Sequence, residues 1–450
     1  MGISSQELYM THIVILGGGT AGTIMANRLR RDYAHEIVAG RTAITVVDQD
    51  DRHVYQPGLL FLPFGEYAPE QLVRSRKQQL HRSVSVVRDT VDRVETATNR
   101  VLLSSGSTLD YDLLIVATGT RVAPEETEGL TGPGWQERTF EFYTLEGATK
   151  LRDALARFER GRLVVNVIDM PIKCPVAPLE FAFLADAFFT KRGMRDRVEI
   201  TYVTPLDGAF TKPAAAGELA HLLGEKGIEL VTEFNTGRVD GERGSLTSWD
   251  EREIPFDLLV TVPLHAGAEF VTRSPGLGDD LGFVLTDPHT LQAKAAPNVF
   301  AIGDATNVPT SKAGSVAHFE AEILSDNIRR YLALQPLAPD FDGHANCFIE
   351  TGFNRALLID FNYDIEPLPG RFPLGKFGPM RLLRESRLNH LGKLAFRWIY
   401  WNVLLPGRDI PGVGARMSLR GKKPLTPVKA APSAAATTQP LEAPGAFVVR

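Results

Sequence analysis

The fold of this chain is decided by Thr11-His-Ile-Val-Ile-Leu-Gly-Gly-Gly-Thr-Ala-Gly22. The apolar run predicts a strand that leads directly into Gly17, Gly19 and Gly22, in the spacing GxGxxG. Residues 23–30 read as a helix, and residues 43–48 read as a second strand that ends in Asp48. Together these features predict a dinucleotide-binding fold, because the glycines and the helix N-terminus admit a pyrophosphate and the acid suits a ribose.

Length, charge and cysteine content exclude several classes of protein. The 450 residues suffice for two or three domains, and the net charge of −5 argues against nucleic acid as a partner. Residues 1–11 lack the pattern of a signal peptide, and no apolar run is long enough for a transmembrane helix. With only Cys174 and Cys347, we expect neither a disulfide scaffold nor a metal site, although two thiols are enough for one redox pair.

A second set of residues points to the same nucleotide. Ile302-Gly-Asp304 ends a predicted strand, and Asp304 suits a ribityl hydroxyl. A long helix is predicted over residues 313–332, and its N-terminus at Ala313-Gly314, preceded by Lys312, favours negative charge on a reduced ring. Ala117-Thr118-Gly119 ends another predicted strand. The combination predicts FAD as the cofactor.

The alternation of predicted strands and helices defines the fold class. We predict an α/β protein with two Rossmann-like doubly wound domains, the second inserted in the first, and a C-terminal amphipathic membrane-binding region. The predicted parts are the FAD-binding domain at 10–125 and 282–340, the second domain at 126–281, the membrane-attachment region at 341–421 and a disordered tail at 422–450.

The inserted domain lacks the glycine turn that a second nucleotide would need. The corresponding turn, residues 169–178, has no glycine and three prolines, which offer no N–H to a phosphate. It carries Cys174 instead, beside Lys173, which we expect to favour the thiolate. Together with Cys347 this predicts a dithiol beside the flavin. Hydrosulfide would attack the disulfide, and the released thiolate would pass two electrons to the flavin.

At this point the sequence resembles the sulfide:quinone oxidoreductases, within the two-dinucleotide-binding-domain flavoproteins. The residues that carry the resemblance are Val54–Gly58, Lys173–Pro178, Gly303–Ala305, Pro309–Phe319, the Cys347 strand and Leu382–Pro406. The resemblance implies that Cys174 and Cys347 hold the growing sulfur chain and that quinone takes electrons on the other side of the flavin. It also implies that Gln56 and Pro57 flank the ring, with Lys312 and Gly314 close to it.

The chain departs from the family in one respect. Many members carry a third cysteine shortly after the Ala117-Thr-Gly119 motif, and residues 118–140 contain none. Chemistry with two cysteines is still complete, but which cysteine carries the persulfide stays open.

Residues 381–405 predict an amphipathic helix. Its polar face carries Ser386, His390, Lys393 and Arg397, and the other face carries Leu391, Leu394, Ala395, Trp398 and Ile399. Aromatic residues with flanking arginines suit a lipid bilayer surface, so we expect a peripheral, monotopic protein of the cell membrane. A helix packed on the protein itself, or a contact in a homo-oligomer, is the alternative.

The expected function is FAD-dependent oxidation of hydrosulfide to sulfane sulfur or polysulfide by Cys174 and Cys347, with a membrane quinone as acceptor. A type-II NADH:quinone oxidoreductase is the first alternative, but it needs glycines in residues 169–178. A sulfide dehydrogenase subunit with a cytochrome acceptor is the second. His318 fits a quinone pocket or a packed histidine equally well, and Glu350 fits a surface acid better than a proton acceptor.

Overall fold

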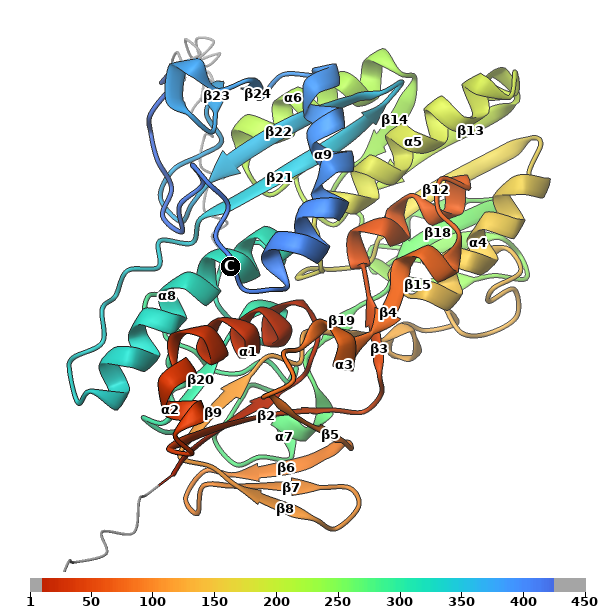
Figure 1. Cartoon of the computed structure of the whole chain (residues 1–450). Helices are drawn as coiled ribbons and strands as arrows, with labels where there is room; N and C mark the ends of the chain where they lie inside the picture. The colour runs from red at the N-terminus through yellow and green to blue at the C-terminus, as the bar shows by residue number, and fades with distance from the viewer. Residues whose placement is uncertain (1–9, 425–450) are drawn as a thin grey trace, which may run out of the picture.

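The structure is a computed structural model that describes residues 10–424 (Figure 1). Most of the predicted disordered tail lies outside the described residues. The first sheet is parallel, with strand order β20-β9-β1-β2-β5. Its strands are β1 (Thr11–Leu16), β2 (Thr42–Asp48), β5 (Ser85–Arg88), β9 (Leu113–Val116) and β20 (Val299–Ala301). Because β20 follows the inserted segment, the first domain is built from two separate parts of the chain.

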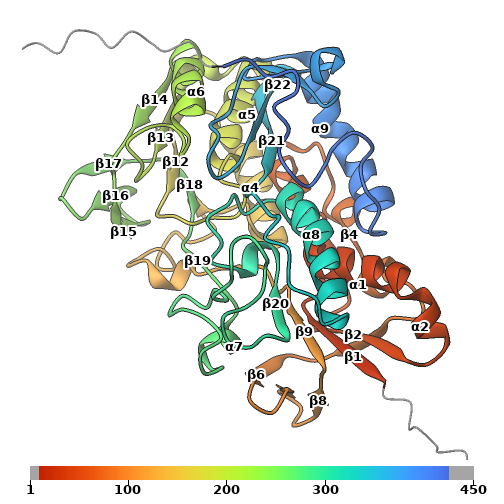
Figure 2. The same ribbon diagram turned by 90° about the vertical axis from the view of Figure 1, so that its left-hand side faces the viewer.

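Both faces of this sheet are covered, which explains its continuous apolar strands. Helices α1 (Thr20–Asp32) and α8 (Gly314–Leu332) pack against each other on one face (Figures 1 and 2). The antiparallel meander of β6 (Val91–Glu95), β7 (Arg100–Leu103) and β8 (Thr108–Asp110) lies on the other face, with α7 (Glu269–Thr272). Strand β1 leads directly into α1, and β9 runs parallel to β1, so the carboxyl ends of both strands lie near the start of α1.

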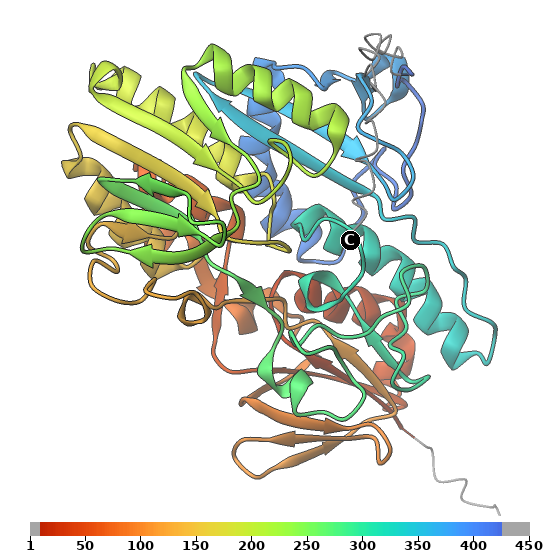
Figure 3. The same ribbon diagram turned by 180° about the vertical axis from the view of Figure 1, so that it is seen from behind.

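A second parallel sheet forms the inserted domain, in the order β11-β18-β12-β13-β14. Its strands are β11 (Thr139–Phe140), β12 (Gly161–Val167), β13 (Val198–Val203), β14 (Ile228–Val231) and β18 (Leu258–Val262). Helices α4 (Leu145–Arg157), α5 (Ala177–Lys191) and α6 (Pro213–Glu225) accompany it. Viewed from behind, this domain (yellow to green) lies above the N-terminal one (Figure 3).

The two domains are joined by β10 (Arg121–Val122) and β19 (His265–Ala266), which pair antiparallel. Helix α6 begins at Pro213, because proline suits the first turn of a helix and the three alanines that follow favour helix. The remaining short strands are β3 (Arg52–Val54), β4 (Val73–Ser75), β15 (Thr236–Asp240), β16 (Ser245–Ser248) and β17 (Glu253–Pro255). The remaining short helices are α2 (Ala34–Val38), α3 (Arg76–Gln79), η1 (Gln56–Leu60), η2 (Leu62–Phe64), η3 (Pro69–Leu72), η4 (Pro124–Glu126), η5 (Arg195–Arg197) and η6 (Gly303–Ala305).

The C-terminal region is an antiparallel hairpin, β21 (Ala345–Gly352) and β22 (Arg355–Phe361), between α5 and helix α9 (Arg387–Ile399) (Figure 1). Helix α9 starts at Arg387 because the Ser386 hydroxyl accepts a hydrogen bond of 3.0 Å from the Asn389 N–H. The predicted helix over residues 381–405 is therefore shorter, and it continues as one π-helical turn, η8 (Tyr400–Leu404). The region also contains β23 (Gly370–Phe372), η7 (Gly375–Phe377) and β24 (Met380–Leu382).

Candidate flavin and sulfur site

The glycine turn between β1 and α1 is closely packed and admits no side chain at two positions. Gly17 has a φ of +92°, and a methyl group there would lie 2.6 Å from the carbonyl oxygen of Ala117. A methyl group on Gly22 would lie 1.8 Å from the carbonyl oxygen of Gly17. At Gly19 a methyl group would meet nothing within 4 Å, so this residue faces open space. The turn therefore places a bare backbone at the helix N-terminus, where an anion binds well.

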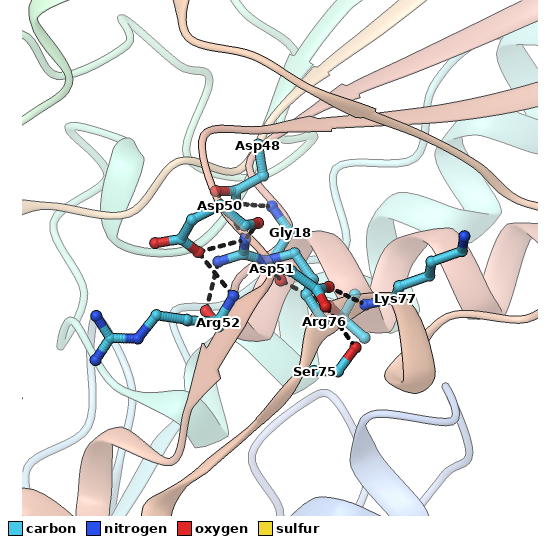
Figure 4. A network of polar contacts seen from close by, with 9 residues as sticks. Gly18, Asp48, Asp50, Asp51, Arg52, Ser75, Arg76 and Lys77 are labelled. Carbon is cyan, nitrogen blue, oxygen red and sulfur yellow. Dashed lines mark hydrogen bonds and ion pairs between the residues drawn. The ribbon is translucent and has the colours of Figure 1, made fainter.

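Asp48 at the end of β2 holds this turn in place (Figure 4). Its carboxylate accepts a hydrogen bond of 2.6 Å from the Gly18 N–H and pairs with Arg76 at 3.0 Å. Arg76 is buried on α3 and also donates to the carbonyl oxygen of Gly18. Burial raises the pKa of Asp48, while Arg76 and the Gly18 N–H oppose that rise. No motif marks Arg76 in the sequence, so this contact was not anticipated.

Three adjoining cavities run from the carboxyl ends of the strands of the first sheet toward α9. The sheet-edge cavity is lined by Gly17, Asp48 and Arg121, among others. It shares Thr118, Gly119 and Thr120 with the central cavity. The aromatic cavity is lined by Tyr55, Phe61, Phe348, Phe372 and Ile399, and it shares Pro57, Cys174, Ala313, Gly314, Lys393 and Phe396 with the central cavity.

Most predicted cofactor residues meet in the central cavity: Gly19, Gln56, Pro57, Ala117, Thr118, Gly119, Gly303, Asp304, Lys312, Ala313 and Gly314. Gly17 and Asp48 line the sheet-edge cavity, and Gly22 packs inside the turn. The buried hydroxyls of Thr118 and Thr120 have no hydrogen-bond partner among the described residues, although both line the two cavities. A long groove with unpaired hydroxyls and a bare glycine turn fits a dinucleotide such as FAD.

Lys312 is tied to the backbone beside this groove. Its ammonium group is buried and donates to the carbonyl oxygens of Asp304, at 2.9 Å, and Thr306, at 2.7 Å. The Gly303 N–H donates to the fully buried carboxylate of Glu320 over 2.6 Å. These two contacts hold the Gly-Asp turn. Glu320 was not predicted from the sequence. It lies on the buried side of α8, and no motif in the neighbouring sequence marks it.

The two cysteines come from different elements and line the same aromatic cavity. Cys174 lies in the turn between β12 and α5 with a φ of +47°, and it also lines the central cavity. Cys347 is buried on β21. Both thiols are free in the structure. Cys174 therefore stands on the wall between the groove that fits FAD and the cavity that holds the other thiol.

The electrostatics of the thiols differ from the sequence expectation. Burial raises the pKa of both thiols, that of Cys347 to about 12, and the Glu180 carboxylate adds to this. The cation that lowers the pKa of both is Lys393 on α9, not Lys173. Burial lowers the pKa of Lys173, and the carboxylates that oppose this shift are Asp304 and Glu141, so its charge is not directed at the thiols as we expected. A thiolate here depends on Lys393.

Helix α9 turns its polar side chains inward. Lys393 forms an ion pair with the fully buried Glu180, and the His390 ring lies 2.9 Å from the carboxylate of Glu350. Glu350 is 1% exposed, so the interpretation as a surface acid was wrong. It is buried because β21 lies beneath α9. The polar face predicted from the sequence is thus the face that packs on the protein.

The outward face of α9 is apolar. Leu391 is 56% exposed and Trp398 is 65% exposed. Leu388 and Leu394 on the same helix are also exposed. This arrangement is the reverse of an ordinary surface helix, which buries its apolar side. Within residues 10–424, no helix is both long enough and apolar enough to cross a membrane.

His318 on α8 lines the aromatic cavity and is 1% exposed. Within the described chain, neither of its ring nitrogens has a hydrogen-bond partner. Burial lowers the pKa of His318 to about 4, so the ring is neutral at physiological pH. A neutral imidazole has one donor and one acceptor, and both are available to a ligand in this cavity.

The fold and the groove define a class: a flavoprotein oxidoreductase with two Rossmann-like domains. The family model described as pyridine nucleotide-disulphide oxidoreductase matches residues 11–321, and the chain belongs to this family. The α/β fold with Rossmann-like sheets, the oxidoreductase assignment and FAD as cofactor, all predicted from the sequence, are confirmed.

The resemblance seen in the sequence is confirmed by individual relatives. The mitochondrial sulfide:quinone oxidoreductase of Mus musculus is 29% identical over 88% of this chain and 86% of its own length. That of Dictyostelium discoideum is 26% identical over 89% and 87%. The solved sulfide:quinone oxidoreductase of Aquifex aeolicus superposes with a TM-score of 0.73 at 19% identity, covering 88% of this chain and 92% of its own.

Proposed function

We propose that this protein oxidises hydrosulfide through Cys174 and Cys347 and delivers the electrons to a membrane quinone. The observation that carries the proposal is the position of Cys174, on the wall shared by the central and aromatic cavities, with Cys347 lining the latter. The similarity to the sulfide:quinone oxidoreductases of Mus musculus and Dictyostelium discoideum supports the same activity. The glycine turn, Asp48, Thr118 and Asp304 would hold FAD, which would act as the carrier of two electrons.

The chemistry of the thiols follows from the cavity. With the two cysteines joined as a disulfide, hydrosulfide attacks one sulfur, one S–S bond forms and one breaks, and the second cysteine leaves as a thiolate. That thiolate carries the electron pair of the oxidation. Burial and the Glu180 carboxylate both disfavour the negative charge of this thiolate. The Lys393 ammonium group is the cation that favours it.

We place the quinone site in the aromatic cavity, at its α9 end. Because Cys174 and Cys347 line the same cavity, this position differs from the one on the other side of the flavin that the resemblance implies. Phe396 lines both this cavity and the central one, and Ile399 extends the apolar lining toward the end of α9. His318 offers a hydrogen bond to a quinone oxygen. The exposed apolar face of the same helix suits contact with a bilayer, where a quinone dissolves.

The experiment that tests the proposal is an anaerobic titration of the purified flavoprotein, followed by flavin absorbance. We expect sulfide to bleach the flavin and NADH to leave it oxidised, because the turn before α5 has no glycine cradle. A soluble short-chain quinone should then restore the colour faster than a cytochrome does. Bleaching by NADH alone would contradict the proposal and favour an NADH:quinone oxidoreductase.

A further inference from the structure

Four titratable side chains form a buried series between the central cavity and the outside of α9. At the inner end, Glu180 on α5 is fully buried and lines the central cavity. Lys393 pairs with it, donates 3.1 Å to the carbonyl oxygen of Phe348, and lines both the central and the aromatic cavities. The inner end of the series therefore meets the space proposed for the flavin and the quinone.

The outer half of the series leads to the surface. The backbone N–H of Glu350 donates to the Glu180 carboxylate over 2.6 Å. The Glu350 carboxylate lies 2.9 and 3.0 Å from Nδ1 of His390, one distance for each oxygen. The His390 side chain is 15% exposed, so its ring reaches solvent. The Glu350 and His390 side chains thus lead from the interior to water, and the Glu350 backbone N–H joins them to the Glu180–Lys393 pair at the cavity.

The pKa shifts of Glu350 and His390 favour a mobile proton between these two side chains. Burial raises the pKa of Glu350 to about 8, with Glu180 and Glu66 adding to the rise and Lys393 opposing it. Burial also lowers the pKa of His390, which Lys191 and Lys393 reinforce and Glu66 opposes. The two shifts both favour the neutral forms, a carboxylic acid that faces an imidazole. A proton can pass along such a pair without leaving an uncompensated charge in the interior.

We propose that Glu350 and His390 form the route by which a proton from solvent reaches the quinone. The proposal rests on the proposed function. Oxidation of one hydrosulfide ion to sulfane sulfur releases two electrons and one proton, whereas reduction of a quinone to a quinol takes up two of each. One proton must therefore come from water in every turnover. His390 receives it at the surface, and Glu350 accepts it from Nδ1. The Lys393 ammonium group, which lines both cavities, gives one of its protons to the quinone and regains a proton from Glu350.

The test separates quinone reduction from sulfide oxidation. In the Glu350→Gln and His390→Gln holoenzymes, we expect sulfide to reduce the flavin at the wild-type rate. Reoxidation by a soluble quinone should slow about tenfold or more and lose its dependence on pH near 8, because a positioned acid is missing. The matched control is the exposed pair on α6, where His221 and Glu225 lie 3.3 Å apart. Glu225→Gln and His221→Gln should change neither rate.

Two results would overturn the route. One is reoxidation in the His390→Gln holoenzyme at the wild-type rate, with the wild-type pH profile. The other is an infrared difference spectrum, wild type minus Glu350→Gln at pH 7, that shows no carboxylic acid band. If sulfide fails to reduce the wild-type flavin, the proposed function fails instead. Reoxidation is then measured after reduction with dithionite, so the two failures are distinguishable.

Discussion

The backbone N–H of Cys174 donates a hydrogen bond of 2.7 Å to the carbonyl oxygen of Lys312. This contact ties the cysteine turn of the inserted domain to the segment that leads into α8. Lys312 in turn holds the carbonyl oxygen of Asp304. A single chain of contacts therefore sets the position of the thiol relative to the groove that fits FAD. It also explains the left-handed backbone of Cys174, which costs a residue other than glycine conformational energy.

The first prediction concerns the two thiols. We expect Cys174→Ser and Cys347→Ser to keep FAD bound, because neither side chain supports the glycine turn. Reduction of the flavin by sulfide should fall by about 10³-fold or more, since a hydroxyl cannot replace the thiolate. Stopped-flow absorbance measures the rate, and dithionite reduction of the same samples is the control. A variant of either residue with full turnover would refute the dithiol mechanism.

The second prediction concerns the outward face of α9. Leu391→Glu combined with Trp398→Glu should weaken binding to lipid vesicles by at least about tenfold, because each apolar side chain loses its favourable burial in the bilayer. Vesicle flotation measures the bound fraction. Sulfide-driven flavin reduction should not change, because both side chains point away from the cavities.

Trp249→Glu provides the matched control for this face. Trp249 is 77% exposed between β16 and β17, which lie on the opposite side of the molecule from α9 (Figure 2). Its substitution should leave vesicle binding unchanged. Equal loss of binding in both variants would mean that α9 is not the contact with lipid.

The glycine turn and the cysteine turn could be predicted because each is a local pattern with a direct physical reason. The contacts between Arg76 and Asp48, and between Lys393 and Glu180, join residues far apart in the sequence, and one partner in each contact, Arg76 or Glu180, carries no local signal. Periodicity likewise revealed two faces on α9 but not which face packs inward. That choice depends on carboxylates from α5 and β21, which only the tertiary structure brings beneath the helix.

The third prediction concerns His318. Replacement by leucine should raise the stability of the protein, because an imidazole with no partner among the described residues is costly to bury. The same change should raise the KM for a soluble quinone by about 2- to 10-fold through the loss of one hydrogen bond. The rate of flavin reduction by sulfide should stay constant. A more stable variant with an unchanged KM would show that His318 is a packing residue.

The last prediction concerns Glu320, whose pKa burial raises to about 8. An acid whose pKa rises on folding binds more protons in the folded state than in the unfolded state, here between about 4.5 and about 8. Its contribution to the free energy of unfolding therefore falls as the pH rises through this window. Glu320→Gln removes that dependence and keeps an acceptor for the Gly303 N–H, whose present bond to Glu320 is 2.6 Å long.

Relative to wild type, the Glu320→Gln holoenzyme should become more stable as the pH rises from about 5 to about 8, by up to about 1.4 kcal/mol per pH unit. Urea unfolding at several pH values measures this difference, and Glu225→Gln on the exposed side of α6 is the control. Glu320→Ala should instead be less stable at every pH, because it leaves the Gly303 N–H without its acceptor. Parallel curves for Glu320→Gln and wild type would mean that Glu320 is ionised in the folded protein, and that Lys312 compensates its charge more fully than its burial suggests.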